Sequence, residues 1–195
     1  NQAGIILFGS DAIISNNTIE WNDFLGVYAG YWSNSTIENN WIDSNWVYGI
    51  WVSGGSNSDP KPSNPTIRNN TISDSGRGTT TANGIHVVVY SSPIIKNNTI
   101  LRSTEDGIYA GQECRALIEN NTIDGAKYGI ATSSVGYLEV INTTISNTTQ
   151  WDISVSGGQV NFINTTFNKS KVVFQDSFSY TNLTVNWFLH TFIKD

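Results

Sequence analysis

The stretch Ile118-Glu119-Asn120-Asn121-Thr122-Ile123 is one copy of a six-residue phrase that returns along the chain and decides its fold. The closing apolar residues of successive copies lie 22 to 30 positions apart. A repeat of this length predicts a stack of one-turn units built on a shared core. The other copies begin at Ile14, Ile37, Ile67, Ile95, Val140 and Phe162.

A second phrase alternates with the first and consists of a Gly followed by an alternating apolar segment, as in Gly49-Ile50-Trp51-Val52. Asp152 takes the Gly position in the last copy. Alternation with period two over three to five residues predicts short strands, and no segment sustains a helical period. The other copies begin at Gly4, Gly26, Gly84, Gly107 and Gly129.

Short strands that return about every 22 residues fit one turn of a parallel β-helix, whereas a propeller blade needs about 40 residues. Each strand then pairs with its equivalent one coil along, at ~4.8 Å, so that equivalent residues stack. We therefore predict an all-β parallel β-helix of about seven coils. Two internal apolar ladders follow, one of Ile5, Val27, Ile50, Ile85, Ile108, Ile130 and Ile153, the other of Ile19, Ile42, Ile72, Ile100, Ile123, Ile145 and Phe167.

These phrases resemble those of the right-handed parallel β-helix proteins of the pectate-lyase-like superfamily, and of the NosD-like repeat proteins in particular. Units of that group also read Gly-Ile…Ile-x-x-Asn-x-Ile. The resemblance covers residues 3–170 and implies a right-handed coil in a surface protein of an archaeon or bacterium. NosD-like proteins are associated with copper, but two His, one Cys and no Met do not supply a soft-ligand site. We therefore predict no metal and no cofactor.

The bulk composition narrows the classes of partner and the location. The formal net charge is −6, with 10 Lys and Arg against 16 Asp and Glu, which disfavours a nucleic-acid partner. No apolar run approaches the ~20 residues that span a bilayer, so we expect no membrane insertion within this segment. The richness in Asn, Ser and Thr suits an extracellular or cell-surface location. Cys114 is alone and is expected to be a small, partly buried residue.

The first Asn of the six-residue phrase occurs in every copy, and six of the seven are Asn-x-Thr sequons. Asn39 keeps the Asn although Trp41 replaces the Thr, which favours a structural role. Asn tolerates the left-handed backbone region, and sharing strand parity with Ile14 predicts an inward side chain for Asn16. We therefore predict an internal ladder, too buried for glycans, of Asn16, Asn39, Asn69, Asn97, Asn120, Asn142 and Asn164.

Four further sequons lie away from this corner. Because they fall outside the predicted ladder, they are the predicted glycosylation sites in a host that glycosylates Asn. These sites are Asn34, Asn147, Asn168 and Asn182.

The position after each Gly-Ile pair is predicted to face outward, since it alternates with a buried apolar residue. Consecutive coils would present Tyr28, Trp51, His86 and Tyr109 in a row, which we call the aromatic row. Two interpretations stay open: same-face packing of rings along the solenoid, or a surface that binds sugar rings or a neighbouring protein. Residues near enough in sequence to widen the row are Tyr31, Trp32, Trp46 and Tyr48.

Two insertions in the third coil are expected to form loops beside the aromatic row, at residues 54–66 and 73–83. Long loops on a rigid scaffold are where function concentrates.

No catalytic residue is predicted. Cleavage of a glycosidic bond needs two carboxylates ~5–9.5 Å apart, and the outward row itself offers none. The nearby charged residues are interpreted as solvated loop charges, and whether the chain is an enzyme is left open, with the balance against it. These residues are Asp74, Arg77, Glu105 and Asp106.

The repeat fails after Phe167, and alternation from Leu183 to Ile193 predicts one strand of about 11 residues. This segment resembles the one that follows β-helix domains in archaeal surface proteins. We therefore divide the chain into a parallel β-helix, residues 1–170, and a capping or linking segment, residues 171–195. An uncapped β-helix end is an open sheet edge, so head-to-tail self-association is a further expectation.

Two functions are compatible with these patterns. The first is a non-catalytic extracellular structural or interaction module of a cell-surface, sheath, filament or adhesin-like protein. The alternative is a β-helix domain that binds or cleaves polysaccharide, as a lyase or hydrolase. The expected partners are carbohydrate or neighbouring surface-protein subunits.

Overall fold

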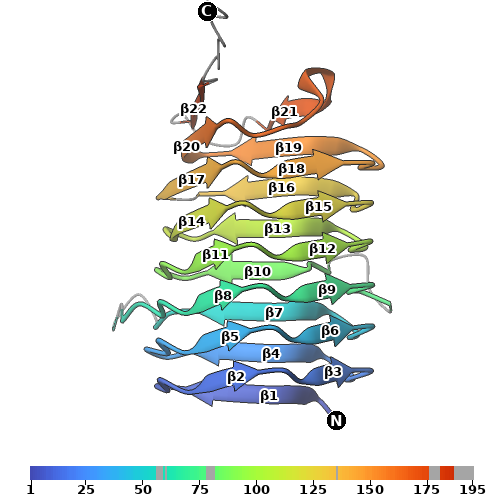
Figure 1. Ribbon diagram of the computed structural model, residues 1–195. Helices are drawn as coiled ribbons and strands as arrows, with labels where there is room; N and C mark the ends of the chain where they lie inside the picture. Colours follow the sequence, from blue (N-terminus) through green and yellow to red (C-terminus); the bar gives the residue numbers. More distant parts are fainter. Residues whose placement is uncertain (56–58, 60, 78–81, 135, 176–180, 187–195) are drawn as a thin grey trace, which may run out of the picture.

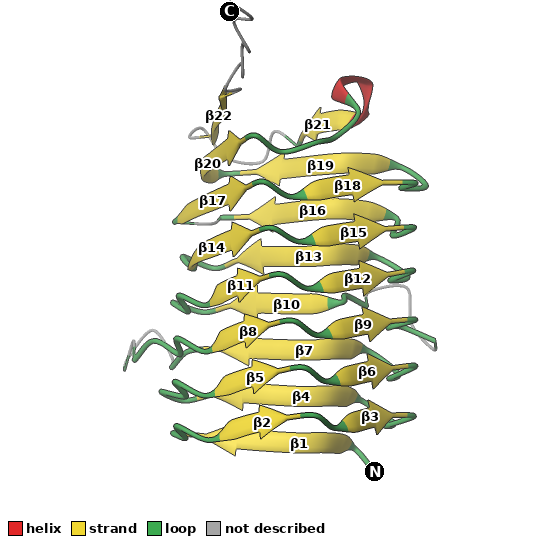
Figure 2. Cartoon of the chain, viewed as in Figure 1, coloured by secondary structure: helices red, strands yellow, loops and turns green. Residues whose placement is uncertain are grey.

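A computed structural model describes residues 1–55, 59, 61–77, 82–134, 136–175 and 181–186. Figure 1 shows the chain winding into a column whose coils follow the sequence from bottom to top. The fold is a right-handed parallel β-helix with three parallel sheets, as predicted. Among the described residues the single helical element is a 3₁₀ turn, η1 (Lys169–Lys171), so strands and corners make up the rest (Figure 2).

Sheet A is built from the Gly-Ile phrases and has eight strands in the order β1-β4-β7-β10-β13-β16-β19-β21. Neighbouring strands are parallel and come from successive coils. The strands are β1 (Ala3–Phe8), β4 (Leu25–Gly30), β7 (Tyr48–Ser53), β10 (Ile85–Val88), β13 (Asp106–Gly111), β16 (Tyr128–Ser133), β19 (Trp151–Ser156) and β21 (Val172–Phe174).

Sheets B and C share the six-residue phrase, whose first half lies in sheet B and whose second half lies in sheet C. Sheet B contains β2 (Ile13–Ser15), β5 (Thr36–Glu38), β8 (Thr66–Arg68), β11 (Ile94–Lys96), β14 (Arg115–Glu119), β17 (Tyr137–Ile141), β20 (Gly158–Ile163) and β22 (Thr181–Asn186). Sheet C contains β3 (Thr18–Glu20), β6 (Trp41–Asp43), β9 (Thr71–Ser73), β12 (Thr99–Leu101), β15 (Thr122–Asp124) and β18 (Thr144–Ser146).

The core consists of stacked apolar ladders, and the strand register confirms both predicted ones. Ile50 pairs with Ile85 in sheet A, and Ile72 pairs with Ile100 in sheet C. Most members are fully buried, and each such side chain contributes about 1.5–3 kcal/mol of transfer free energy. Sheet B adds a third ladder from the residue that opens each phrase: Ile14, Ile37, Ile67, Ile95, Ile118, Val140 and Phe162.

The Gly of the second phrase lies where the sheet C ladder meets the backbone of sheet A. A Cβ placed on Gly107 would lie 2.3 Å from Cγ2 of Ile123 and 2.7 Å from the carbonyl oxygen of Gly129. Neither neighbour can move away to make room for it, since one is a packed core side chain and the other is backbone. Gly is therefore required before the Ile of this phrase, because the narrow coil leaves no room for a Cβ at that position.

The first Asn of each phrase occupies the corner between sheets B and C with a left-handed backbone. Its φ is 55° at Asn39, 56° at Asn97 and 54° at Asn120, and the other four copies are similar. A left-handed residue interrupts the in–out alternation of a strand, so the direction of side chains before the corner does not predict the direction of those at or after it. The prediction that these Asn side chains point inward was therefore wrong, because they lie outside the core. Asn164 is half-buried, and the exposed ones are Asn16, Asn39, Asn69, Asn97, Asn120 and Asn142.

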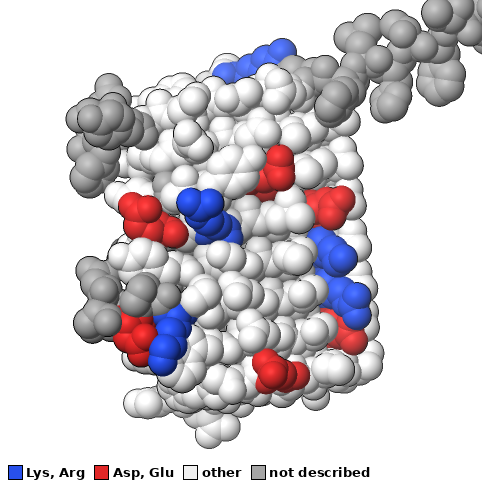
Figure 3. Space-filling view, turned by 90° about the vertical axis from the view of Figure 1, so that its left-hand side faces the viewer, with Lys and Arg blue, Asp and Glu red and all other residues white. Residues whose placement is uncertain are grey.

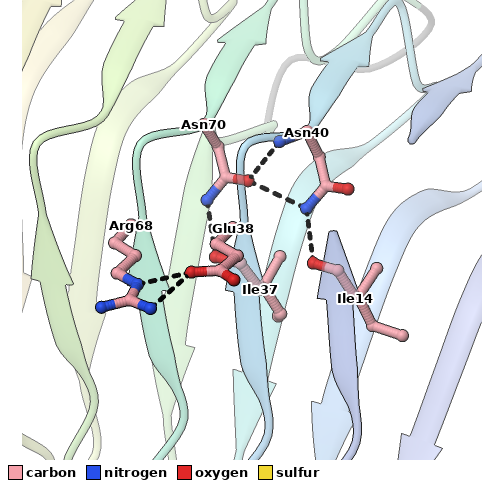
Figure 4. A network of polar contacts seen from close by, with 6 residues as sticks. All are labelled: Ile14, Ile37, Glu38, Asn40, Arg68 and Asn70. Atoms are coloured by element: carbon pink, nitrogen blue, oxygen red, sulfur yellow. Dashed lines mark hydrogen bonds and ion pairs between the residues drawn. The ribbon is translucent and has the colours of Figure 1, made fainter. Parts of the chain in front are cut away.

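The buried ladder is formed instead by the second Asn of the phrase, one residue later. Figure 4 shows two members, in which Oδ1 of Asn70 accepts hydrogen bonds from the backbone N–H of Asn40 at 3.0 Å and from its Nδ2 at 3.0 Å. Nδ2 of Asn40 also donates to the carbonyl oxygen of Ile14 at 2.9 Å. Each amide thus joins its own coil to both neighbours.

The same coil-to-coil amide bonds link the inner ladder, which consists of Asn17, Asn40, Asn70, Asn98 and Asn121. Asn17, in the first coil, is exposed, and the other four are buried. In the last two coils Thr takes the position. The hydroxyl of Thr143 accepts from the N–H of Asn121 at 3.3 Å, and the hydroxyl of Thr165 donates to the carbonyl of Val140 at 3.1 Å. Buried polar groups at this corner are therefore paired from coil to coil.

The tail continues two of the sheets beyond the last full coil. β21 pairs with β19 in sheet A, and β22 pairs with β20 in sheet B, both in parallel. The predicted 11-residue strand is represented by β22, Thr181–Asn186, and its remainder lies outside the described residues.

Replacement of a ladder amide should cost more stability than replacement of its exposed neighbour. Asn98→Ala leaves the N–H groups of Asn70 and the carbonyl of Ile67 without their partner, at about 1–3 kcal/mol for each unpaired buried group. Asn97→Ala costs only the left-handed backbone penalty of roughly 1–2 kcal/mol. Urea denaturation followed by circular dichroism compares them, with Asn97→Gly as the control that removes the backbone penalty. A larger loss for Asn97→Ala than for Asn98→Ala would contradict the inner ladder.

Candidate functional site

The candidate site begins with the aromatic row on the outer face of sheet A. Strand register aligns Tyr28 with Trp51, Trp51 with His86, and His86 with Tyr109. All four side chains are half-buried. The structure thus brings the four predicted residues together as one continuous row that follows the long axis of the β-helix.

The rings of the row touch one another. Tyr28 and Trp51 meet edge to face with centroids 5.3 Å apart, and Trp51 meets His86 in the same way at 6.1 Å. His86 and Tyr109 are stacked with centroids 4.8 Å apart and planes inclined by 9°. Such pairs hold ring orientation and contribute about 0.5–1.5 kcal/mol each beyond their buried area.

Further rings widen the row at its N-terminal end. Tyr48 stacks on His86 at 4.4 Å, Phe24 contacts Trp51 at 6.2 Å, and Phe8 contacts Tyr28 at 5.3 Å and Tyr31 at 5.5 Å. Of the residues that were predicted to widen the aromatic row, Tyr31 and Tyr48 are therefore part of this ring cluster. Phe8 and Phe24 were not among the predicted neighbours, although Phe8 lies two residues beyond the outward Ile6 and points to the same side of the strand.

The row ends at Tyr109 because the next outward residues are small. Ala131 and Ser154 follow in register, and a hollow of about 430 Å³ opens where rings would otherwise lie. Its walls are mostly polar. They include Glu105, Asp106, Tyr109, Tyr128, Thr132, Ser133, Ser156 and Gln175. We call this the polar hollow.

Two adjacent carboxyl groups line the polar hollow and differ in environment. Glu105 forms an ion pair with Nζ of Lys127 at 2.8 Å. Asp106 is only 6% exposed, and burial, with a smaller effect from Glu105, raises the pKa of its carboxyl to about 7. The interpretation of Asp106 as a solvated loop charge was wrong, because Asp106 opens β13 and is buried there.

Charge is otherwise sparse, and some of the charged side chains form ion pairs. Figure 3 shows Lys, Arg, Asp and Glu on one side of the molecule as small groups of both signs on a largely uncharged surface. Arg68 bonds Glu38 at 2.6 Å, and the predicted loop charge Asp74 bonds Arg102 at 2.6 Å. The outward positions that continue the aromatic row in sheet A carry no charge: Ile6, Tyr28, Trp51, His86, Tyr109, Ala131, Ser154 and Val173.

The two third-coil insertions leave the column at opposite ends of the sheet A strands, so they flank the aromatic row (Figure 1). In their described parts, Lys61 lies over the ring of Trp32 at 3.5 Å, and the guanidinium of Arg77 lies over Trp21 at 3.8 Å. These cation–π contacts attach each loop to an earlier coil. Trp46 is exposed and is not among the rings that contact the aromatic row in the described residues.

Comparison with protein families agrees with this geometry. The family model described as "Right handed beta helix region" matches residues 61–188, well over half of the chain. The chain belongs to the right-handed β-helix family. This β-helix protein is also similar, over residues 1–83, to the family described as "Periplasmic copper-binding protein (NosD)". No curated protein and no solved structure matches it.

The NosD similarity raises the question of copper, and the residues present do not fit a copper site. No cluster of three or more His, Cys, Asp or Glu side chains occurs in the described part of the chain. Nδ1 of His86 is hydrogen-bonded to the side chain of Asn83 at 2.7 Å, and His190 lies outside the described residues. Cys114 is buried in the core, where desolvation raises the pKa of its thiol to about 12. A protonated thiol is a poor soft-metal ligand.

The two family matches point to an extracellular or periplasmic β-helix module. Within the described residues, no helix has both the length and the apolar character required to cross a bilayer.

Protonation of Asp106 gives the β-helix an unusual dependence of stability on pH. The folded-state pKa of about 7 lies above the unfolded value near 3.8, so the native state loses stability as pH rises between them. Asp106→Asn removes this loss, and we expect the variant to gain stability over wild type at pH 8 but not at pH 4. Urea denaturation at both pH values measures the difference. The adjacent Glu105→Gln, which loses the Lys127 ion pair, should instead be less stable than wild type at pH 8.

His86 should stay neutral in mildly acidic solution. Its burial between Tyr48 and Tyr109 lowers the imidazole pKa to about 4. Since the unfolded value is near 6.5, stability should fall as pH drops from 6.5 towards 4. NMR titration of a His190→Gln variant leaves His86 as the one titrating imidazole. A midpoint above pH 6 would show that the ring stack does not exclude water.

Proposed function

We propose that this β-helix protein is a non-catalytic module outside the cytoplasm that binds polysaccharide along the outer face of sheet A. The observation that carries the proposal is the aromatic row, which runs without interruption into the polar hollow. An apolar platform beside convergent polar groups is the usual composition of a ligand site.

The aromatic row suits the apolar faces of sugar rings. Tyr28, Trp51 and Tyr109 expose part of their rings, and successive members lie on strands separated by ~4.8 Å. A glycan chain laid along the axis of the β-helix would meet one ring after another. Their mutual contacts fix the rings before binding, so little side-chain entropy is lost.

The polar hollow supplies the hydrogen bonds that an aromatic platform lacks. Ser133, Ser154 and Ser156 line it with hydroxyl groups, and Gln175 adds an amide whose Nε2 donates to Oγ of Ser154 at 3.1 Å. Asp106 is a donor when protonated and an acceptor otherwise. Because the row carries no cation and Lys127 is already paired with Glu105, a neutral glycan fits better than a uronate-rich one.

The carboxyl groups support binding rather than cleavage. Glycoside hydrolysis needs one carboxyl as an acid and a second one free as a base or nucleophile. At the polar hollow Glu105 is held by Lys127 through both carboxylate oxygens, at 2.8 and 3.0 Å. Asp106 is then the one unpaired carboxyl among the hollow's described lining residues.

A contact with a neighbouring protein subunit is the second candidate function, and the N-terminal end of the aromatic row favours it. Ile6 and Phe8 are 55% and 61% exposed there, and with Phe24 they line an apolar depression of about 210 Å³. Exposed apolar clusters of this kind mark protein contacts. Self-association, including the head-to-tail form, belongs to this candidate and is measured by sedimentation velocity across a concentration series.

Truncation of a ring in the aromatic row should weaken glycan binding. Loss of one stacking partner costs about 1–2 kcal/mol, so we expect Trp51→Ala to lower affinity roughly 5- to 30-fold. A panel of neutral and uronate-rich polysaccharides, measured by affinity electrophoresis and calorimetry and checked for released reducing ends, provides the test. Trp41→Ala is the matched control, because Trp41 is exposed on sheet C, away from the row.

Binding that survives Trp51→Ala, or equal losses in both tryptophan variants, would overturn the proposed platform. Release of reducing ends or of unsaturated products by the wild-type protein would overturn its non-catalytic character.

A further inference from the structure

The outer corner between sheets B and C carries a row of accessible Asn-x-Thr sequons. The left-handed corner turns the first Asn of each phrase away from the core, while the second points inward. Within the described residues, the side-chain amides of five exposed sequon asparagines form no hydrogen bond. They are Asn16, Asn69, Asn97, Asn120 and Asn142.

At this corner the coil geometry makes the outer Asn, and not the inner ladder Asn, the first residue of each sequon. Two residues after an outer Asn comes an outward Thr at the start of a sheet C strand, such as Thr99 after Asn97. Two residues after an inner ladder Asn comes a buried Ile, such as Ile100 after Asn98. The acceptor Asn of each of these five sequons therefore lies on the surface, and its amide is not one of those that hold the coils together.

We propose that this row is a set of N-glycan acceptor sites on the folded β-helix. The co-substrate is an oligosaccharide linked to a lipid through phosphate or pyrophosphate, and an oligosaccharyltransferase catalyses the transfer. Nδ2 of the Asn forms a bond to the anomeric carbon of the first sugar, and the bond from that carbon to the phosphate oxygen breaks. The lipid phosphate leaves with the bonding electron pair, and the amide gives up one proton.

Strand spacing limits how many neighbours carry a glycan at once. Adjacent coils are separated by ~4.8 Å, which is less than the width of a hexose ring with its hydroxyl groups. Asn69, Asn97, Asn120 and Asn142 lie on consecutive coils and compete. Asn16 does not compete, because its neighbour at this corner, Asn39, has Trp41 two residues later and is not part of a sequon.

The sequons outside the row differ in availability. Asn34 is exposed; its backbone N–H donates to the carbonyl oxygen of Ser10 at 3.0 Å, and its side chain forms no hydrogen bond with the part of the chain that the structure describes. Nδ2 of Asn147 donates to Asp124 at 2.6 Å, and Oδ1 of Asn168 accepts from the N–H of Ser170 at 3.0 Å as the cap of η1. Asn16 and Asn34 should therefore be modified more fully than Asn147 and Asn168.

The test is site occupancy after secretion of the chain from a eukaryotic host. Release of glycans by an amidase in ¹⁸O-water converts each modified Asn into a labelled Asp, which peptide mass spectrometry locates. We expect high occupancy at Asn16 and partial, alternating occupancy from Asn69 to Asn142. Absence of label from the whole row, whether or not Asn34 is labelled, overturns the proposal.

Two substitutions test whether the folded row sets the pattern. Trp41→Thr completes a sequon at Asn39, so we expect a new glycan there and at least a two-fold drop in occupancy at Asn16 or Asn69. Thr99→Val removes the sequon at Asn97 while keeping its corner Asn, and should raise occupancy at Asn69 and Asn120. If neither substitution changes the glycan occupancy of the neighbouring sites, the folded row does not set the pattern, and this part of the proposal is overturned.

Discussion

The structure depends on one backbone constraint, the left-handed residue at the corner between sheets B and C. A chain that turns there with positive φ reverses the side on which the next side chain falls. The second Asn is thereby directed into the core, where its amide bonds both adjacent coils, as Asn70 does with Asn40 and Asn98. These bonds oppose any slip between coils, because a one-residue shift would leave several buried donors and acceptors unpaired.

The fixed register is what turns scattered aromatic residues into a surface. Successive members of the aromatic row, Tyr28, Trp51, His86 and Tyr109, are 23 to 35 residues apart in the sequence, yet coil-to-coil pairing aligns them within contact distance. The same alignment produces the polar hollow, since small residues at two successive positions leave unfilled volume beside Tyr109. The candidate site therefore arises where the outward residues of sheet A differ from one coil to the next, while the rest of each coil is equivalent.

Much of the fold follows from sequence because periodicity directly encodes stacking. The isoleucine ladders and the alignment of the four aromatic residues needed only the repeat and strand alternation. The asparagine ladder was misplaced by one residue because alternation does not hold across a left-handed corner, and seven Asn-Asn or Asn-Thr pairs at that corner leave both positions available. Burial of Asp106 was missed because it depends on what lies beside it on other coils, such as Tyr128 in register and Asn83, which a local pattern does not report.

The change from Asn to Thr in the inner ladder has a mechanical consequence. An amide receives two hydrogen bonds from the preceding coil, whereas the Thr143 hydroxyl receives one, from the N–H of Asn121. Since the cohesion of a solenoid is a sum over neighbouring coils, resistance to extension is unequal along the column. Under tension, the coils joined through Thr143 and Thr165 yield before those joined through Asn70 and Asn98, so the β-helix unravels in a preferred direction.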